Sequence, residues 1–433
     1  MQRALMKKLV EWKDAPRRKP LILNGARQVG KTWLLKEFGR THFESVAYVN
    51  LDDSPTMREQ FELGYDIDRI VSAIQFETGQ IVSEGSTLVI LDEIQECPKA
   101  LTSLKYFCEK RPGLAVAAAG SLLGITVHEG TGYPVGKVNT LDLYPLSFRE
   151  FLSASGNVSL VDLLDSNDAA LISSFSSKFI PLLRQYYYVG GMPEAVMAFL
   201  ERGLLEDARA VQRQIILDYE FDISKHLSRT ETEYTIAAWN SVPSHLGREN
   251  KRFVFGHIAE GARARDFRSG ITWLTQAGIA LRVPRISKPD IPLRSYEDPS
   301  IFKLFLADIG LLGAMVQLDK NAVISGSDIF EEFKGALTEQ YVCQQLVSEN
   351  ALSPYYWSAK SSTGEIDFLV QSGTDVFAIE VKADENLRAK SLRSFKKAHP
   401  ETKALRFSLS GYREQDWMRN VPLYAISCKG LWS

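Results

Sequence analysis

The sequence predicts an α/β protein of two to four domains. At 433 residues the chain is too long for one ordinary hydrophobic core. In its first third, apolar β-prone runs alternate with helical patterns. This is typical of a parallel sheet covered by helices, because parallel strands are buried on both faces and need crossover helices. A second group of β-prone runs with short connections lies near the C-terminus, so we expect a second α/β domain there.

After an opening helix, five apolar runs are expected to form the N-terminal sheet: PLILNG, SVAYVNLD, STLVILDE, LAVAAAGS and VNTLDLYPL. From about Ser147 to Ser228 the strand signals stop and helical periodicity takes over. The segment YYYVGGMPEAV interrupts these helices, and its two adjacent glycines indicate a turn or a close backbone approach. Its tyrosines could stack on bases, but at a turn between helices core or interface positions are favoured.

The segment from about Glu231 to Gln317 is interpreted as a winged helix-turn-helix. We expect helices around IAAWNSV and VFGHIAEGA, then a helix, an Ala-Gly break at residues 277 and 278, and the short strand IALRV. The basic residues of this segment are Lys251, Arg252, Arg263, Arg265 and Arg268. They fit either DNA phosphates or a solvated helix face, and the interleaved Asp266 weakens the patch.

From about Ile329 onward, a helix leads into further strand candidates. These are YYWSA, GEIDFLVQ, VFAIEVKA, KALRFSLS and PLYAISC. The pattern predicts an α/β domain with short connections.

Composition and charge restrict the class of protein. Hydrophobic residues make up 45% and charged residues 24%, as in ordinary globular proteins, and the net charge of −2 gives no overall attraction to nucleic acid or an anionic membrane. The four cysteines are scattered, without the close pairs of zinc sites or the density of disulfide-stapled secreted domains. Because no run reads as a secretion signal or a membrane span, we expect a cytoplasmic protein without membrane contact.

The segment GARQVGKT, Gly25–Thr32, matches the GxxxxGKS/T pattern of a phosphate-binding loop. A strand candidate precedes it and a helical pattern follows, which is the context that the motif requires. The glycines let backbone N–H groups point at the β- and γ-phosphates of ATP, Lys31 would neutralise phosphate charge, and Thr32 would bind Mg²⁺. The residues predicted to contact the nucleotide are Gly25, Ala26, Arg27, Gln28, Val29, Gly30, Lys31, Thr32 and Trp33.

Two acidic residues end a wholly apolar strand candidate, LVILDE, further along the chain. Asp92 would hold Mg²⁺ together with Thr32, and Glu93 would polarise the attacking water. Ser121 ends the next strand candidate, where its hydroxyl would contact the γ-phosphate or the water; a hydroxyl that satisfies a local turn explains it equally well. The order of the two main motifs, each on the expected element, predicts an ATPase.

With these motifs, the chain resembles the AAA-type ATPases of bacteria and archaea that carry a domain of unknown function after the ATPase core. The segments that carry the resemblance are NGARQVGKTWLL, LVILDEIQECP, AAAGSLLG, LDLYPLSFREFL, YYYVGGMPEAV and KLFLADIGLLGAMV. The resemblance covers nearly the whole chain. The resemblance implies an AAA-type P-loop core, a helical lid, a winged-helix-like domain and a restriction-endonuclease-like domain, at residues 1–146, 147–230, 231–320 and 321–433.

One departure from this family concerns the residue that stabilises the transition state. Where the family commonly has Gly-Arg before the last core strand, this chain has Gly136 and Lys137. Lysine keeps the charge but loses the planar fork with which arginine clamps a phosphate. Whether Lys137 or Arg149 serves, in its own subunit or across the interface of a homo-oligomer, is left open.

Charged residues also interrupt the C-terminal strand candidates. Asp367 lies in EIDFLV, while Glu380 and Lys382 share one face of the next strand, because residues i and i+2 of a strand point the same way. An Asp followed by Glu-x-Lys is similar to the arrangement of restriction-endonuclease-like nucleases, in which two carboxylates bind Mg²⁺ and a lysine activates water.

Glu339 supplies a fourth candidate for this site. In EEFKGALTEQYVCQQLV it falls on the edge of the stripe at positions 333, 336, 340, 343 and 347, where a carboxylate needs a compensating cation. We therefore predict a metal site of Glu339, Asp367 and Glu380, with Lys382 as its catalytic lysine. A strand-end salt bridge of Lys382, with a solvated Glu339, is the alternative.

The leading hypothesis is an Mg²⁺-dependent ATPase whose nucleotide state repositions a winged helix and a nuclease-like tail that act on DNA. The alternative is a nucleotide-regulated DNA- or partner-binding signalling protein with a catalytically inactive nuclease fold. A processive DNA motor is ranked last, since no helicase motifs accompany the two nucleotide motifs. ATP and Mg²⁺ are the predicted cofactors, and DNA and a second copy of the chain stay open as partners.

Overall fold

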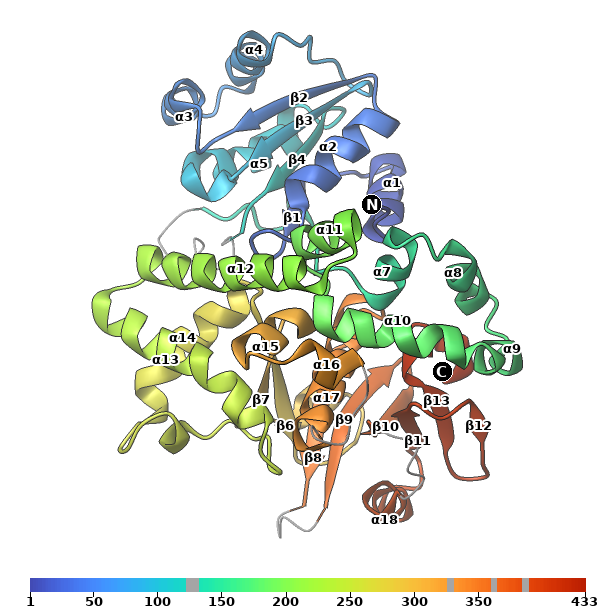
Figure 1. Cartoon of the computed structure of the whole chain (residues 1–433). Helices are drawn as coiled ribbons and strands as arrows, with labels where there is room; N and C mark the ends of the chain where they lie inside the picture. The colour runs from blue at the N-terminus through green and yellow to red at the C-terminus, as the bar shows by residue number, and fades with distance from the viewer. Residues whose placement is uncertain (122–131, 325–330, 360–363, 384–388) are drawn as a thin grey trace. The chain divides into compact units, whose positions relative to one another are not determined.

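The computed structural model describes residues 1–121, 132–324, 331–359, 364–383 and 389–433. The chain divides into two compact units. The N-terminal unit comprises residues 2–144 with residues 276–278, and the C-terminal unit comprises residues 145–275 and 279–433. Figure 1 labels most of the helices and strands of both.

The N-terminal unit is built on a five-stranded parallel sheet of order β2-β3-β4-β1-β5. Its strands are β1 (Leu21–Asn24), β2 (Ser45–Asn50), β3 (Thr87–Asp92), β4 (Ala115–Ala119) and β5 (Asn139–Asp142). Its helices are α1 (Leu5–Asp14), α2 (Lys31–His42), α3 (Pro55–Glu62), α4 (Ile67–Thr78) and α5 (Pro98–Lys110), with a 3₁₀ turn, η1 (Ile94–Glu96). The opening helix and all five predicted strands are confirmed.

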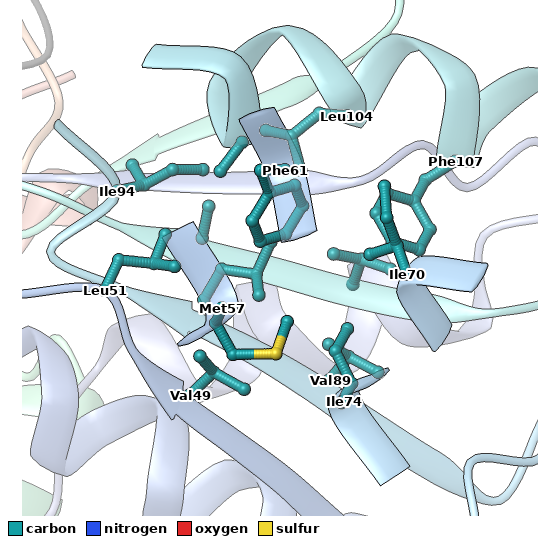
Figure 2. Packing of buried hydrophobic residues seen from close by; sticks show 14 of the residues in the cluster. Val49, Leu51, Met57, Phe61, Ile70, Ile74, Val89, Ile94, Leu104 and Phe107 are labelled. Carbon is teal, nitrogen blue, oxygen red and sulfur yellow. The ribbon is translucent and has the colours of Figure 1, made fainter. Parts of the chain in front are cut away.

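A hydrophobic core on one face of this sheet holds the strands in place. Figure 2 shows part of it, with Met57 and Phe61 from α3 and Ile70 and Ile74 from α4 packed near Val89 of β3. Every residue of β3 is buried, which is the reason that its sequence is apolar throughout. The polar residue that ends this strand is thereby fixed at the carboxyl edge of the sheet.

The C-terminal unit begins with helices and ends with a sheet. Its helices are α7 (Phe148–Ala154), α8 (Val158–Asp165), α9 (Ala169–Ser174), α10 (Ser176–Val189), α11 (Pro193–Arg202), α12 (Leu205–His226), α13 (Arg229–Leu246), α14 (Ala264–Gln276), α15 (Ile309–Met315), α16 (Lys320–Ile324), α17 (Glu331–Ser348) and α18 (Lys390–Ala398). Short 3₁₀ turns are η3 (Phe255–His257), η4 (Leu293–Tyr296), η6 (Leu423–Ala425) and η7 (Lys429–Leu431).

The sheet of this unit is mixed and eight-stranded, in the order β12-β13-β11-β10-β9-β8-β6-β7. Its strands are β6 (Ala280–Ile286), β7 (Glu297–Leu306), β8 (Tyr355–Ser358), β9 (Glu365–Ser372), β10 (Asp375–Val381), β11 (Lys403–Ser408), β12 (Arg413–Glu414) and β13 (Arg419–Pro422). The strand expected as a wing, β6, pairs with β7 and, through Arg285 and Tyr356, also with β8. The α/β class is confirmed, while the winged helix, the nuclease-like fold and the four-domain division stay predictions.

Helix α17 lies inside the C-terminal unit. Every residue from Ala336 to Leu346 is buried, so the helix has no solvated face in that stretch. Its glutamines satisfy backbone groups: the Gln340 amide accepts from the N–H of Leu306 at 2.9 Å and donates to its carbonyl at 2.7 Å. The expectation that Glu339 is not an outward-facing residue is confirmed.

Two predicted elements are wrong. The segment VFGHIAEGA forms only the 3₁₀ turn η3 followed by turns, because Gly256 and Gly261 disfavour a continuous helix and Gly261 adopts a φ of +77°. The run PLYAISC is not a strand: β13 ends at Pro422 and η6 follows. The apolar run reflects burial, which periodicity alone cannot distinguish from a strand.

Of the helices that the structure describes, none combines the length and the apolar composition needed to cross a lipid bilayer.

Candidate functional site

The phosphate-binding loop connects β1 to α2 in the N-terminal unit. Gly30 precedes the helix in a left-handed conformation, with φ of 92°, and Gln28 also has a positive φ of 64°. A Cβ on Gly25 would overlap the carbonyl oxygen of Leu143, so only glycine fits at the start of the loop. These backbone angles curl the loop around the N-terminus of α2, where N–H groups and the helix dipole attract phosphate.

Lys31 is buried beneath this loop. Its ammonium donates to the carbonyl oxygens of Gly25 at 2.9 Å and Ala26 at 2.8 Å. Burial lowers the pKa of Lys31 to about 8, although the carboxylates of Glu93 and Asp92 act in the opposite direction. Phosphate oxygens would replace the loop carbonyls as acceptors and favour the charged form.

The predicted magnesium ligands lie together at the carboxyl edge of the sheet. The Thr32 hydroxyl donates to Asp92 Oδ2 at 2.7 Å, and the hydroxyl of Tyr48, on β2, donates to the same oxygen at 3.0 Å. The other oxygen, Oδ1, accepts from the N–H of Glu93 at 3.1 Å. The loop and the acidic strand end, which are far apart in the sequence, are thus joined by a direct hydrogen bond.

Glu93 follows Asp92 in a strained backbone conformation, with φ of 49°. The side-chain amide of Gln95 donates to Glu93 Oε2 at 2.5 Å, and the oxygen of that amide is buried without a hydrogen-bond partner. Non-glycine residues with positive φ often occur at functional sites, where the surrounding structure maintains the strain. Here the Gln95 amide fixes the direction of the Glu93 carboxylate.

Ser121 is buried at the end of β4, beside β1. Its hydroxyl accepts from Nε of Arg27, a residue of the phosphate-binding loop, at 3.2 Å. This bond places Ser121 next to the loop, as both sequence interpretations allow. The remainder of the motif AAAGSLLG, residues 122–124, lies outside the described residues.

The donor set of this site fits Mg²⁺. A hydroxyl and a carboxylate are hard oxygen ligands of the kind that Mg²⁺ prefers, and no ammonium group is bonded to Asp92 among the contacts described above. Of the other predicted nucleotide contacts, Ala26 and Val29 are buried, and Trp33 is 45% exposed.

Neither Lys137 nor Arg149, the two candidates for the transition-state cation, lies beside the phosphate-binding loop within a single unit. Lys137 precedes β5, whose first residue is level with Leu21, the first residue of β1, so Lys137 lies at the edge of the sheet opposite the phosphate-binding loop. It forms an ion pair with Glu109 at 2.9 Å. Arg149 belongs to the C-terminal unit and pairs with Asp165. A role across a subunit interface stays a prediction for either residue.

Two of the three predicted C-terminal carboxylates, Glu339 and Glu380, are paired with lysines. Glu339 is buried and forms ion pairs with Lys251 and, at 3.6 Å, with Lys303. Lys303, on β7, is fully buried and also lies 2.5 Å from Glu365 Oε1. The compensation that Glu339 requires is therefore supplied by two ammonium groups.

Asp367 and Glu380 lie on adjacent antiparallel strands, β9 and β10, as predicted. Asp367 Oδ2 accepts from the N–H of Val381 at 2.7 Å. Burial, and then the nearby Glu339 carboxylate, raises the pKa of Asp367 to about 7. Such a carboxyl is largely protonated below neutral pH, which reduces the number of negative charges facing the lysines.

Glu380 pairs with Lys382 at 3.1 Å, which is the strand-end salt bridge of the alternative interpretation. In the part of the chain that the structure describes, no group of three or more His, Cys, Asp or Glu side chains is arranged to hold a metal ion. A divalent ion bound by Glu339, Asp367 and Glu380 would have to displace ammonium groups already in place. The residues as arranged do not fit a metal, and the predicted metal site stays a prediction.

The predicted basic patch is smaller than its sequence suggests. Lys251 is mostly buried in its ion pair with Glu339, so it is not a surface cation. Arg263, Arg265 and Arg268 are exposed at the start of α14, with Arg265 Nε 3.4 Å from Asp266. Two of the three tyrosines of YYYVGGMPEAV are confirmed as core residues: Tyr186 is fully buried and Tyr188 is 4% exposed, while Tyr187 is half-buried.

Three further residues complete these sites but were missed by the sequence interpretation: Tyr48, Gln95 and Lys303. Tyr48 belongs to no motif, and Gln95 lies in LVILDEIQECP, where the sequence interpretation gave it no role. Lys303 carried a signal, because a lysine inside the apolar run IFKLFLAD is expected to need a buried partner.

Family models match both the N-terminal and the C-terminal parts of the chain, but only the N-terminal match carries a functional description. Residues 17–152 match the family model described as AAA domain. Residues 180–322 and 334–427 match two models described as Domain of unknown function (DUF8612) and Domain of unknown function (DUF4143). No curated protein matches the chain. The first match supports an AAA-type, nucleotide-binding ATPase, and the other two add no function.

Solved structures with similar features include a Walker-type ATPase, PABY2304, of Pyrococcus abyssi, at 14% identity and a TM-score of 0.43, covering 72% of this chain and 94% of that chain. The Aeropyrum pernix ORC1 protein in complex with DNA aligns at 14% identity and a TM-score of 0.27, covering 73% of this chain and 92% of that chain. The Thermotoga maritima RuvB Holliday junction branch migration motor aligns at 16% identity and a TM-score of 0.29, covering 66% of this chain and 90% of that chain. At these TM-scores the alignments do not establish a shared whole-chain fold.

Proposed function

We propose that the chain binds ATP with Mg²⁺ at the phosphate-binding loop and hydrolyses it. The observation that carries this proposal is the hydrogen bond of 2.7 Å between Thr32 and Asp92, which joins the loop to the acidic strand end. Thr32 and Asp92 would hold Mg²⁺, which when bound neutralises charge on the β- and γ-phosphates.

The remaining roles belong to the protein's own residues. The N–H groups of the loop and the ammonium of Lys31 bind the phosphates, and Glu93 orients the attacking water and accepts its proton. Gln95 holds Glu93 through the bond of 2.5 Å, so the base is oriented before the nucleotide arrives. Ser121, next to Arg27 of the loop, is the remaining polar group proposed to contact the γ-phosphate.

Substitution of Lys31 tests this proposal. Lys31→Ala removes the charge that binds the phosphates, and we expect ATP turnover to fall by about 100-fold or more, measured as phosphate release. Lys110→Ala is the matched control, because Lys110 ends α5 at the opposite edge of the sheet and donates to the carbonyl of Tyr65 at 3.4 Å. Unchanged hydrolysis by Lys31→Ala would show that the site is wrong.

For the C-terminal unit we propose binding in preference to cleavage: a nuclease-like fold that is catalytically inactive and contacts DNA under nucleotide control. The ion pairs of Glu339 with Lys251 and Lys303 favour this role over the leading sequence hypothesis of a nuclease. The exposed arginines at the N-terminus of α14 supply groups that bind phosphate. Incubation of the wild-type chain with DNA and Mg²⁺ or Mn²⁺, with and without ATP, distinguishes the two roles. Intact DNA is expected for the binding role, whereas cut DNA would support the nuclease.

A further inference from the structure

The hydroxyl of Tyr48 shares Asp92 Oδ2 with the hydroxyl of Thr32, at 3.0 Å and 2.7 Å. No sequence motif contains this tyrosine. We infer that Tyr48 is a positioning residue of the magnesium site: its hydrogen bond orients Asp92, and through Asp92 it orients Thr32, without Tyr48 itself touching the nucleotide. This inference rests on the proposed ATPase function.

The fold places Tyr48 on the correct side of the sheet for this role. In β2 the alternate residues Ala47 and Val49 are buried in the core that α3, α4 and α5 cover, so Tyr48 points to the opposite face. There Lys36 of α2 lies over the ring, with its Nζ 3.5 Å from the ring centroid. Lys36 is one helical turn after Thr32, so the tyrosine is held by the same helix that carries the proposed magnesium ligand.

The hydrogen bonds restrict the Asp92 carboxylate from both ends. Oδ2 accepts two hydroxyl protons and Oδ1 accepts the N–H of Glu93 at 3.1 Å, so rotation of the carboxylate would break at least one bond. The Thr32 proton is committed to Asp92, which leaves the lone pairs of its oxygen for a cation.

A purely structural role for Tyr48 makes a different prediction. If the ring matters only for packing under Lys36, then Tyr48→Phe keeps that contact and changes nothing at the site. If the hydroxyl positions Asp92, the same substitution weakens metal binding while the ring contact survives. Partners that hydrogen-bond a metal ligand typically contribute a factor of about 10 to 100 in metal affinity.

The experiment is a Mn²⁺ titration of the ADP-loaded full chain, with free Mn²⁺ measured by electron paramagnetic resonance. We expect Tyr48→Phe to weaken Mn²⁺ binding by about 10-fold. Its affinity for ADP in EDTA and its thermal midpoint should match those of the wild type. Tyr65→Phe is the matched control, because Tyr65 lies in the same unit and its ring stacks on Tyr106, with centroids 4.6 Å apart. Asp92→Asn should lose Mn²⁺ binding.

Each outcome decides one point. Failure of the wild type to bind ADP both in EDTA and in the presence of Mn²⁺ would reject the proposed function itself. If the wild type binds ADP and Mn²⁺ but Tyr48→Phe binds Mn²⁺ equally well, the positioning role is wrong and the ATPase site stands. If Tyr48→Phe lowers the affinity for ADP, measured in EDTA, by the same factor as the affinity for Mn²⁺, Tyr48 is structural and the inference is overturned. The same holds if the variant unfolds at a lower temperature than the wild type.

Discussion

Lys303 lies in an environment that is unusual for a lysine. Its side chain is fully buried, and its ammonium lies 2.5 Å from Glu365 and 3.6 Å from Glu339. Burial by itself would lower the pKa of Lys303, but the surrounding carboxylates, Glu339 foremost, raise it above its usual range. The lysine therefore stays charged and acts as a built-in counter-ion for the cluster.

Removing this counter-ion should destabilise the fold. Lys303→Met keeps the length of the side chain but leaves Glu339 and Glu365 without their shared cation, and loss of one member of a buried pair costs about 3–5 kcal/mol. Urea unfolding followed by circular dichroism measures the change. Lys320→Met is the matched control, since Lys320 forms an exposed pair with Glu206, and we expect its free energy of unfolding to be unchanged. If the wild type and Lys303→Met had equal free energies of unfolding, the proposed counter-ion role of Lys303 would be wrong.

At this scale, the sequence predicts residues that belong to a motif and misses those that only support one. Lys31, Thr32, Asp92 and Glu93 were predicted because loop, helix and strand signals agree around them. Tyr48 reaches Asp92 only because β2 and β3 pair in a register that no local pattern specifies. Pairing between distant segments is set by the folded sheet.

At the scale of elements, the turn between α10 and α11 has an unusually close backbone contact. The N–H of Gly191 donates to Asp308 Oδ1 at 2.5 Å, and its carbonyl accepts from the N–H of Leu146 at 2.6 Å. A Cβ on Gly191 would overlap the carbonyl oxygen of Leu146. The glycines of YYYVGGMPEAV are thus required for packing within the C-terminal unit.

Gly191→Ala should therefore be strongly destabilising. The atoms that a methyl group would meet are backbone atoms, which cannot rotate away, and overpacking of this kind costs about 1–3 kcal/mol or more. Gly335→Ala is the matched control, because Gly335 lies in α17 with open space around it and alanine favours a helix by about 0.5–1 kcal/mol. Thermal unfolding that ranks the two variants in the reverse order would contradict the packing argument.

The elements that the sequence predicts incorrectly share one cause. VFGHIAEGA and PLYAISC have the apolar content of a helix and a strand, but Gly256 and Gly261 disfavour a helix in the first, and β13 ends at Pro422, the first residue of the second. Leu423 to Ile426 are nearly fully buried in a turn, so their hydrophobicity reports burial alone. Helix α14 was predicted well because its buried residues, Phe267, Gly270, Ile271 and Leu274, recur at helical spacing.

At the scale of the whole molecule, the C-terminal cluster joins parts of the chain that the sequence assigns to different domains. Lys251 and Lys303 come from the predicted winged helix, whereas Glu339 and Glu365 come from the predicted nuclease-like domain. β6 and β7 likewise continue the sheet of β8 to β13. The lysines could not be assigned to the cluster from the sequence, because only this shared sheet brings them together.

This arrangement predicts that the wild-type chain cuts neither single- nor double-stranded DNA with Mg²⁺ or Mn²⁺, with or without ATP. The reason is that ammonium groups already neutralise Glu339, and Lys382 is bound to Glu380 at 3.1 Å. DNA binding, measured by fluorescence anisotropy, should weaken when Arg263, Arg265 and Arg268 are replaced by glutamate, but not in Glu380→Ala or Lys382→Ala. Cleavage by the wild type that both alanine variants abolish would instead establish the nuclease hypothesis, and would require the lysines to leave the cluster when metal binds.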